Sequence, residues 1–212
     1  SDYDLAIISI KKGNLPEIAI GNSSSLSIGD PVIAFGSPLG LSGTVTSGIV
    51  SALNRPVTTG SLNAESFMDA IQTDAAINPG NSGGALLDSQ GRIIGVNSAI
   101  ATLSSGGTSG SIGLGFAIPI NEAKRVVDEL IASGKSTRPV LGVFFDTTFT
   151  GTGAKISRLS PNEGAEKAGI PAGSVITAID GVKIADQVGA IVKIRSYAPG
   201  STVTVTVLLP TG

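Results

Sequence analysis

A serine stands in a glycine-rich turn near the middle of the chain. The run Gly80-Asn81-Ser82-Gly83-Gly84 follows Asn78-Pro79, a pair that is typical of turns. Because glycine tolerates positive φ and close backbone approach, this turn lets the amide N–H groups of Gly80 and Ser82 converge on one point. Donors aimed at a developing oxyanion are each worth about 2.7–4 kcal/mol in catalysis. The run makes Ser82 a candidate nucleophile beside an oxyanion hole, although this short motif alone favours a plain glycine-rich hairpin. The whole stretch from Thr73 to Leu86 favours the nucleophile.

The spacing Gly80-x-Ser82-x-Gly84 also matches the nucleophile elbow of α/β-hydrolases. That elbow lies between a strand and a helix, whereas here a turn precedes the serine. After the serine come Ala85-Leu86-Leu87, a second turn at Ser89-Gln90-Gly91, and the run Ile93-Ile94-Gly95-Val96. This order indicates a β-hairpin. An α/β-hydrolase esterase is therefore disfavoured, and the absence of His from the sequence argues against it as well.

Two absent residue types narrow the chemistry further. The 212 residues include no Cys and no His, so a zinc site would have only carboxylate ligands, and we expect neither a metal nor a cofactor. The net charge of −2, without clustered Lys and Arg, argues against nucleic-acid binding. No apolar run reaches the roughly 18 residues that indicate a membrane span. A hydrophobic fraction of 41% and 29 glycines suit β-structure with many tight turns.

Short apolar runs separated by Gly, Pro and Ser predict a sandwich or barrel over the first 120 residues. The expected strands are 5–10, 31–36, 44–53, 69–73, 85–87, 93–99 and 112–118. Two stretches, 55–66 and 102–111, are expected to be mobile surface loops. From Asn121 the apolar residues follow a helical spacing that ends near Gly134, and a polar linker follows. A small α+β domain is then predicted, with a helix at 185–197 and strands at 141–145, 154–159, 174–179 and 202–208.

Nearly every position from Gln72 to Leu86 resembles the active-site loop of the HtrA (Deg) family of envelope serine proteases. Further similar blocks are 33–40, 46–51 and 113–119. The resemblance extends over essentially the whole chain and is closest to the actinobacterial, PepD-like branch. It implies a mainly β fold, with a chymotrypsin-like β-barrel (the second barrel plus the end of the first), then a linker helix and an α+β PDZ domain. The corresponding domains are 1–120 (C-terminal part of the trypsin-like protease domain), 121–138 (helix and linker) and 139–212 (PDZ domain).

Carried over position by position, the resemblance implies a Ser-His-Asp triad. Ser82 matches the nucleophile, and Gly80 and Ser82 match the oxyanion donors. Asp4 matches the aspartate that orients the histidine, and Asp2 competes for that role without an apolar strand directly after it. The resemblance places the histidine before residue 1. We therefore expect this polypeptide alone to be proteolytically inactive, because a serine without a general base is a poor nucleophile.

Residues near the serine bear on substrate choice. In trypsin-like enzymes an acid six residues before the nucleophile selects Arg or Lys, and here that position is Ala76. With Ile112 and Leu114 as further lining, the resemblance implies an apolar pocket and cleavage after small or medium aliphatic residues. Asn81 stands where zymogen-activated relatives have an Asp that pairs with a newly cut N-terminus. Control is therefore expected from the ordering of loops, with 55–66, 74–80 and 102–111 as the moving segments.

The run Val140-Leu141-Gly142-Val143 resembles the carboxylate-binding loop of a PDZ domain, and 168–176 resembles an internal turn and strand of that module. PDZ domains add a peptide to a sheet edge and capture its terminal carboxylate with loop N–H groups. The resemblance therefore makes Leu141, Gly142 and Val143 the peptide-binding candidates. Three residues of the expected helix are candidates for the side-chain pocket, with core packing as the alternative: Val188, Ile191 and Val192.

As a whole, the resemblance implies an endopeptidase of envelope protein quality control whose cleavage is tuned by peptides at the PDZ domain. The expected partners are unfolded or misfolded proteins and C-terminal peptides, with no nucleic acid, in a homotrimer. The expected location is the periplasmic or extracellular side of the envelope, with a membrane anchor in a preceding segment. The alternative is a non-catalytic peptide-binding protein on a degenerate protease fold, which the absence of His keeps open.

Overall fold

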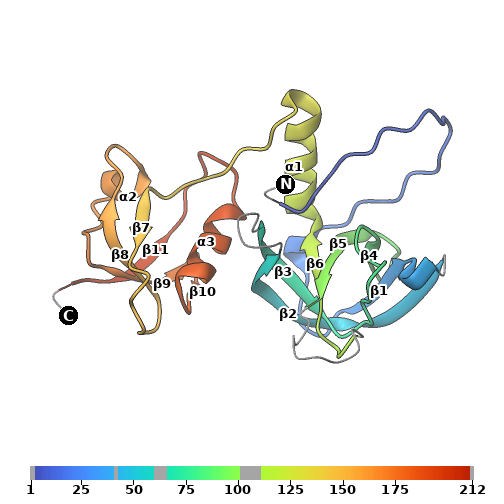
Figure 1. Cartoon of the computed structure of the whole chain (residues 1–212), viewed down its shortest axis with the longest axis horizontal. Coiled ribbons are helices and arrows are strands. Elements are labelled where there is room, and N and C mark those ends of the chain that lie inside the picture. The colour runs from blue at the N-terminus through green and yellow to red at the C-terminus, as the bar shows by residue number, and fades with distance from the viewer. Residues whose placement is uncertain (1–2, 41–42, 60–65, 101–110, 211–212) are drawn as a thin grey trace. The chain divides into compact units, whose positions relative to one another are not determined.

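Six antiparallel strands close into a barrel in the first part of the molecule (Figure 1). The structure is a computed structural model that describes residues 3–40, 43–59, 66–100 and 111–210. Neighbouring strands follow the order β1-β2-β3-β6-β5-β4, and β4 pairs back to β1. Their bounds are β1 Pro31–Gly36, β2 Thr44–Thr59, β3 Ser66–Thr73, β4 Ala85–Asp88, β5 Ile93–Ile100 and β6 Gly115–Pro119. The predicted mainly β fold with a barrel is confirmed.

Aliphatic side chains fill the interior of the barrel. On β1, Val32 and Ala34 are buried, whereas Phe35, the next residue of the strand, is exposed, as the two-residue period of a strand requires. Ile71 of β3 and Leu86 of β4 join them in one cluster. This core holds β3 and β4, the two strands on either side of the segment that contains Ser82.

Two expectations for this region are wrong. Residues 5–10 form no strand, and Figure 1 draws them without an arrow. A strand needs a neighbour for its backbone N–H and C=O groups, residues 5–10 belong to none of the strands of the described structure, and Ile8 is 84% exposed. The expected loop at 55–66 is also too long, because β2 continues to Thr59 and β3 begins at Ser66. Residues 60–65, and 102–110 of the second expected loop, lie outside the described residues.

Helix α1, Ile120–Ser133, follows β6 and packs against β5 and β6 through Ala123 and Val126 (Figure 1). It ends where the sequence predicts, because Gly134 adopts φ 71°, a left-handed conformation that suits glycine. Asn121 is not its N-cap. Its side-chain amide instead donates to Asn22 and Ser24 (2.8 and 2.9 Å), beside the short 3₁₀ helix η1, Ser23–Ser25.

The chain divides into two compact units, Ser1–Ser136 and Thr137–Gly212. The second unit is a five-stranded antiparallel sheet of order β10-β9-β8-β7, with β11 also pairing with β9. Ile156, Ile176 and Ile179 are fully buried in its core. Its elements are β7 Val143–Phe145, β8 Ala154–Leu159, α2 Gly164–Lys167, β9 Val175–Ile179, β10 Val182–Lys183, α3 Gln187–Arg195 and β11 Val205–Leu208.

Membrane-spanning helices were sought over the described ranges. None of the helices found there combines the length and the apolar character needed to cross a bilayer.

Candidate active site and peptide groove

The turn before β4 exposes Ser82 at the edge of the barrel. Two short hydrogen-bonded turns precede and enclose it: the amide of Asn81 donates to Asn78 O, and the amide of Gly84 donates to Asn81 O, both at 2.9 Å. The amide of Gly83 donates to Asn97 O at 2.8 Å, which ties the turn to β5. The backbone on both sides of Ser82 is therefore held by neighbouring strands.

Space as well as conformation requires glycine in this turn. A Cβ on Gly84 would lie 2.0 Å from Phe35 O, and one on Gly80 would lie 2.6 Å from Ser37 O. Gly80 also has φ 101°, which side-chain-bearing residues rarely adopt. The backbone of the turn therefore packs directly against the backbone at the end of β1 and of the residues that follow it.

Two amides of the turn have no acceptor among the residues that the structure describes. From Gly80 to Gly84, only the amides of Gly80 and Ser82 donate to no described acceptor. Both residues are exposed. Preorganised N–H groups of this kind are what a developing oxyanion needs.

The structure brings Asp4 close to Ser82 through Ser98 of β5, although 78 positions of sequence separate the two. The hydroxyl of Ser82 donates to Ser98 O at 3.4 Å, and the hydroxyl of Ser98 donates to Asp4 Oδ2 at 2.6 Å. Ser98 is only 2% exposed. Sequence reasoning missed Ser98, because a serine in an apolar strand gives no signal until the fold brings Asp4 to it.

Two buried asparagines support the turn from below. Asn81 Nδ2 donates to Ala76 O at 3.2 Å, and Thr46 Oγ1 donates to the same carbonyl at 3.1 Å. Asn97 Nδ2 donates to Phe35 O at 2.9 Å and to the carbonyl of Ala85 at 3.2 Å. Asn97, like Ser98, was not among the residues predicted from the sequence.

The residues expected to line a substrate pocket come from two neighbouring segments. The amide of Ser111 donates to Asn78 Oδ1 at 2.7 Å, and a Cβ on Gly115 would lie 2.5 Å from Ile77 Cγ1. Residues 111–115 therefore run alongside 75–78. The three predicted residues lie in these segments, with Ala76 half-buried and the other two exposed: Ala76, Ile112 and Leu114.

The hairpin after Ser82 is closed by a charged pair at its tip. Asp88 accepts hydrogen bonds from the amides of Gln90 and Arg92 (2.9 and 3.0 Å) and from Arg92 Nε at 2.8 Å. Burial opposes the charge of the carboxylate, but these bonds outweigh it and lower the pKa of Asp88. In the described part of the chain, no three His, Cys, Asp or Glu side chains gather as a metal ion would require.

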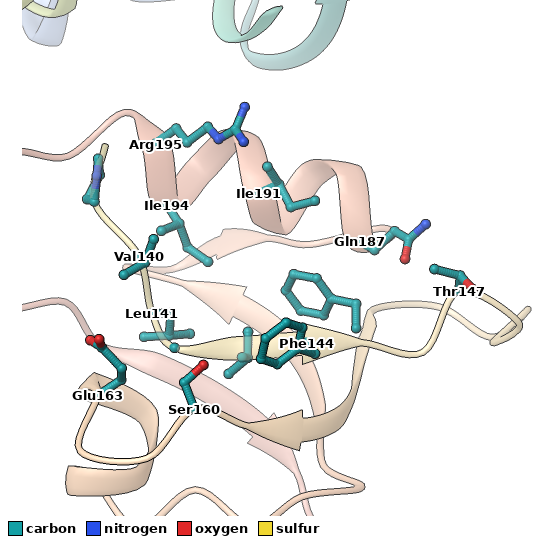
Figure 2. A pocket seen from close by; sticks show the side chains of 14 residues that line it. Val140, Leu141, Phe144, Thr147, Ser160, Glu163, Gln187, Ile191, Ile194 and Arg195 are labelled. Carbon is teal, nitrogen blue, oxygen red and sulfur yellow. The ribbon is translucent and has the colours of Figure 1, made fainter. Parts of the chain in front are cut away.

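A second candidate site is a groove of about 540 Å³ in the second unit, between β7 and α3. Figure 2 shows Ile191 and Ile194 on the helix side and Leu141 at the start of the opposite wall. β7 is the last strand of its sheet, so one of its edges is unpaired in the described structure. Four predicted residues line the groove: Leu141, Gly142, Val143 and Ile191.

Val188 and Val192 do not line this groove, so their assignment is corrected. The groove face of α3 carries Gln187, Ile191 and Ile194, the i, i+4, i+7 positions of one helix face. Val188 and Val192 each follow a groove residue by one position and are therefore turned about 100° away. Arg195 has the same relation to Ile194 but lines the groove, and its side chain is longer than that of valine. Val192 is 2% exposed, which makes it a core residue.

Family comparisons match both units. The description "Trypsin-like peptidase domain" fits residues 1–96, and "PDZ domain" fits residues 137–208. Serine protease PepD of Mycobacterium tuberculosis is 51% identical over 99% of this chain and 46% of its own length. Periplasmic serine endoprotease DegP of Escherichia coli is 41% identical over 97% of this chain and 44% of its own length. The chain thus spans about half the length of these curated relatives.

A solved structure covers both units as well. A variant of the HtrA-type protease AlgW with a tripeptide superposes with a TM-score of 0.65 at 36% identity. The match covers 99% of this chain and 70% of the other.

Proposed function

The chain belongs to the HtrA-type serine proteases, which join a trypsin-like peptidase domain to a PDZ domain, and we propose that Ser82 is the nucleophile of an endopeptidase. The observation that carries this proposal is the hydrogen-bonded path from Asp4 through Ser98 to Ser82, with distances of 2.6 and 3.4 Å. The path gives one exposed serine an aspartate that can orient a histidine base, and the amides of Gly80 and Ser82 lie beside the same serine for the oxyanion of the intermediate.

In the proposed reaction Ser82 Oγ attacks the scissile carbonyl carbon while a histidine removes the hydroxyl proton. The negative oxygen of the tetrahedral intermediate is held by the amides of Gly80 and Ser82. The histidine then gives its proton to the leaving amine, and water hydrolyses the acyl-enzyme by the same route. Asp4 orients the imidazole and stabilises its charged form. Because the 212 residues contain no His, this base must come from outside them, and these residues alone are expected to be inactive.

The same site supports a preference for aliphatic residues before the cleaved bond. Ala76 provides no charge to the segment beside Ser82, and Ile112 and Leu114 add apolar surface next to it. An uncharged pocket leaves a Lys or Arg side chain without a counter-charge. We therefore assign cleavage after small or medium aliphatic residues, in exposed segments of misfolded proteins.

The groove of the second unit is proposed to bind C-terminal peptides that tune this cleavage. The open edge of β7 offers backbone groups for an added strand, and Ile191 and Ile194 offer an apolar wall. Peptide-bound structures of the HtrA-type protease AlgW support this role. The periplasmic relatives support an envelope location. The homotrimer is carried over from the family resemblance alone.

One observation keeps a second function open. A chain without His has no general base of its own, so a peptide-binding protein on an inactive protease fold is the competing proposal.

The deciding experiment needs a histidine. We define the extended protein as this chain joined at residue 1 to the histidine-bearing region that the family resemblance places there. β-Casein cleavage by the extended protein is expected to fall about a thousandfold or more with Ser82→Ala. Ser89→Ala, in the exposed turn of the same hairpin, is the matched control and leaves the rate unchanged. Cleavage that survives Ser82→Ala rejects this mechanism, and no cleavage by the parent extended protein favours the peptide-binding alternative.

A further inference from the structure

The backbone of Asp4 has a positive φ of 53°. Asp and Asn enter the left-handed region more readily than other side-chain-bearing residues, but an extended backbone also remains open to them. The side chain is exposed, and Ser98 is the hydrogen-bond partner that the structure gives to its carboxylate. The choice between the two conformations is therefore left to the packing around Asp4. What fixes Asp4 must therefore be sought in the residues on either side of it.

Both neighbours of Asp4 are packed into the barrel unit. Tyr3 is only 3% exposed. Leu5 packs against an apolar cluster that includes Met68 and Phe116. The chain is thus held immediately before and after the aspartate, and the carboxylate projects between two fixed points.

The contact that holds Tyr3 comes from helix α1. The guanidinium carbon of Arg125 lies 5.3 Å from the centre of the Tyr3 ring, within the range of a cation–π interaction. Arg125 is held in turn by Glu129, one helical turn further on, at 3.0 Å. Both side chains of this ion pair are largely buried, with exposed fractions of 16% and 24%. The aromatic face is therefore met by a cation that its own helix keeps in place.

The charge of Arg125 is secure in this position. Burial disfavours the guanidinium cation, but hydrogen bonding to Tyr3 and Glu129 and the charge of Glu129 outweigh that effect and raise the pKa of Arg125. The cation is therefore present throughout the pH range in which a histidine-dependent protease works.

Taking Asp4 as the triad aspartate of the proposed function, we propose that Tyr3 and Arg125 are positioning residues for catalysis. We call this pair the Tyr3–Arg125 anchor. It holds the backbone of Asp4 in the left-handed conformation and so keeps the carboxylate on Ser98 and toward the histidine. Without the anchor, Asp4 relaxes to an ordinary extended conformation and its carboxylate leaves the line to Ser82. Neither anchor residue touches the substrate.

The chain offers a matched control for this pair on the same helix. Lys124 and Asp128 also form an i, i+4 ion pair, one residue earlier, but both side chains are more than half exposed. Arg125→Met and Lys124→Met therefore remove the same kind of interaction from α1 and keep the length of the side chain. Only the first is expected to reach Asp4.

Kinetics of the extended protein provide the first test. Arg125→Met and Tyr3→Ala are each expected to lower kcat about tenfold or more with KM unchanged, and the double variant is expected to lose no more than either single one. The acid limb of the kcat/KM profile moves to lower pH, because a displaced carboxylate no longer raises the pKa of the histidine. Tyr3→Phe keeps the ring beside Arg125 but loses the phenol oxygen, so it is expected to retain more activity than Tyr3→Ala. Equal kcat values for Arg125→Met and Lys124→Met, or an effect on KM alone, would overturn the proposal.

Fluorescence of the 212-residue chain provides the second test, which does not depend on activity. The sequence has two tyrosines and no tryptophan, so Tyr197→Phe leaves Tyr3 as the sole tyrosine probe. In that background Arg125→Met is expected to raise the acrylamide quenching constant severalfold, and Lys124→Met is not. Unchanged quenching would refute the anchor even if Ser82 proves to be the nucleophile. If Arg125→Met raises the quenching but the parent extended protein is inactive, the contact between Tyr3 and Arg125 is confirmed and its role in catalysis is rejected.

Discussion

Replacement of Gly84 by alanine measures how little room the Ser82 turn has. The added Cβ would lie 2.0 Å from Phe35 O and 2.9 Å from Asn81 O, and both neighbours are backbone atoms that cannot rotate aside. Overpacking of a tight site costs typically 1–3 kcal/mol, and we expect Gly84→Ala to cost about 3 kcal/mol because the whole turn must move away from β1. The same shift displaces Ser82, so the extended protein is expected to lose its cleavage of β-casein.

Two other glycines separate steric overlap from backbone strain. Gly83 and Gly91 have positive φ (85° and 74°), and an added Cβ meets nothing within 4 Å at either position. Each alanine variant is therefore expected to cost about 1–2 kcal/mol from the left-handed backbone alone. Of these two, only Gly83→Ala, beside Ser82, lowers activity. The free energy of unfolding of each variant barrel is measured in urea, with hydrogen exchange of the barrel amides as the readout. A Gly84→Ala barrel as stable as the Gly91→Ala barrel would refute the steric reasoning.

Three further predictions address substrate choice, peptide binding and acid stability. Ala76→Asp puts a carboxylate into the proposed apolar pocket, so kcat/KM for peptides cleaved after Lys, relative to Val, is expected to rise about tenfold or more in the extended protein. Ile191→Asp is expected to weaken binding of an apolar C-terminal peptide by about 1.5–3 kcal/mol in fluorescence anisotropy, while Val188→Asp, off the groove, does not. Because its pKa is lowered on folding, Asp88 stabilises the protein above pH about 4 and loses this effect as the pH falls through its folded pKa. Asp88→Asn is therefore expected to lower stability to urea at pH 7 and to narrow the difference between pH 7 and pH 3.

The sequence predicts those features that depend on local pattern. The strand 31–36 coincides with β1, and the end of α1 at Gly134 follows from the need for a left-handed residue there. The hairpin after Ser82 is recognisable from its turn residues. Residues 5–10 carry an equally good strand pattern and form no strand. An apolar, β-branched run shows that a segment can form a strand, but a strand also needs a neighbouring edge, which local sequence does not reveal.

The candidate sites contain residues that only the fold identifies. Ser98 acquires its role because β5 carries it to Asp4, 94 positions away. Which residues of α3 face the groove depends on how the helix is rotated about its own axis relative to β7. Several apolar residues of α3 are compatible with either the groove or the core, and only the fold shows that Ile191 lines the groove while Val192 is buried in the core.

The central claim is that the hydroxyl of Ser82 is activated beside two free amides. Its most direct test is covalent labelling of the extended protein with a serine-directed organophosphonate, followed by mass spectrometry of the peptide containing Asn78 to Asp88. Our account predicts one phosphonyl group on Ser82 and loss of labelling in Asp4→Ala. A protein that cleaves β-casein while Ser82 stays unlabelled, or that carries the label on another serine, would contradict it.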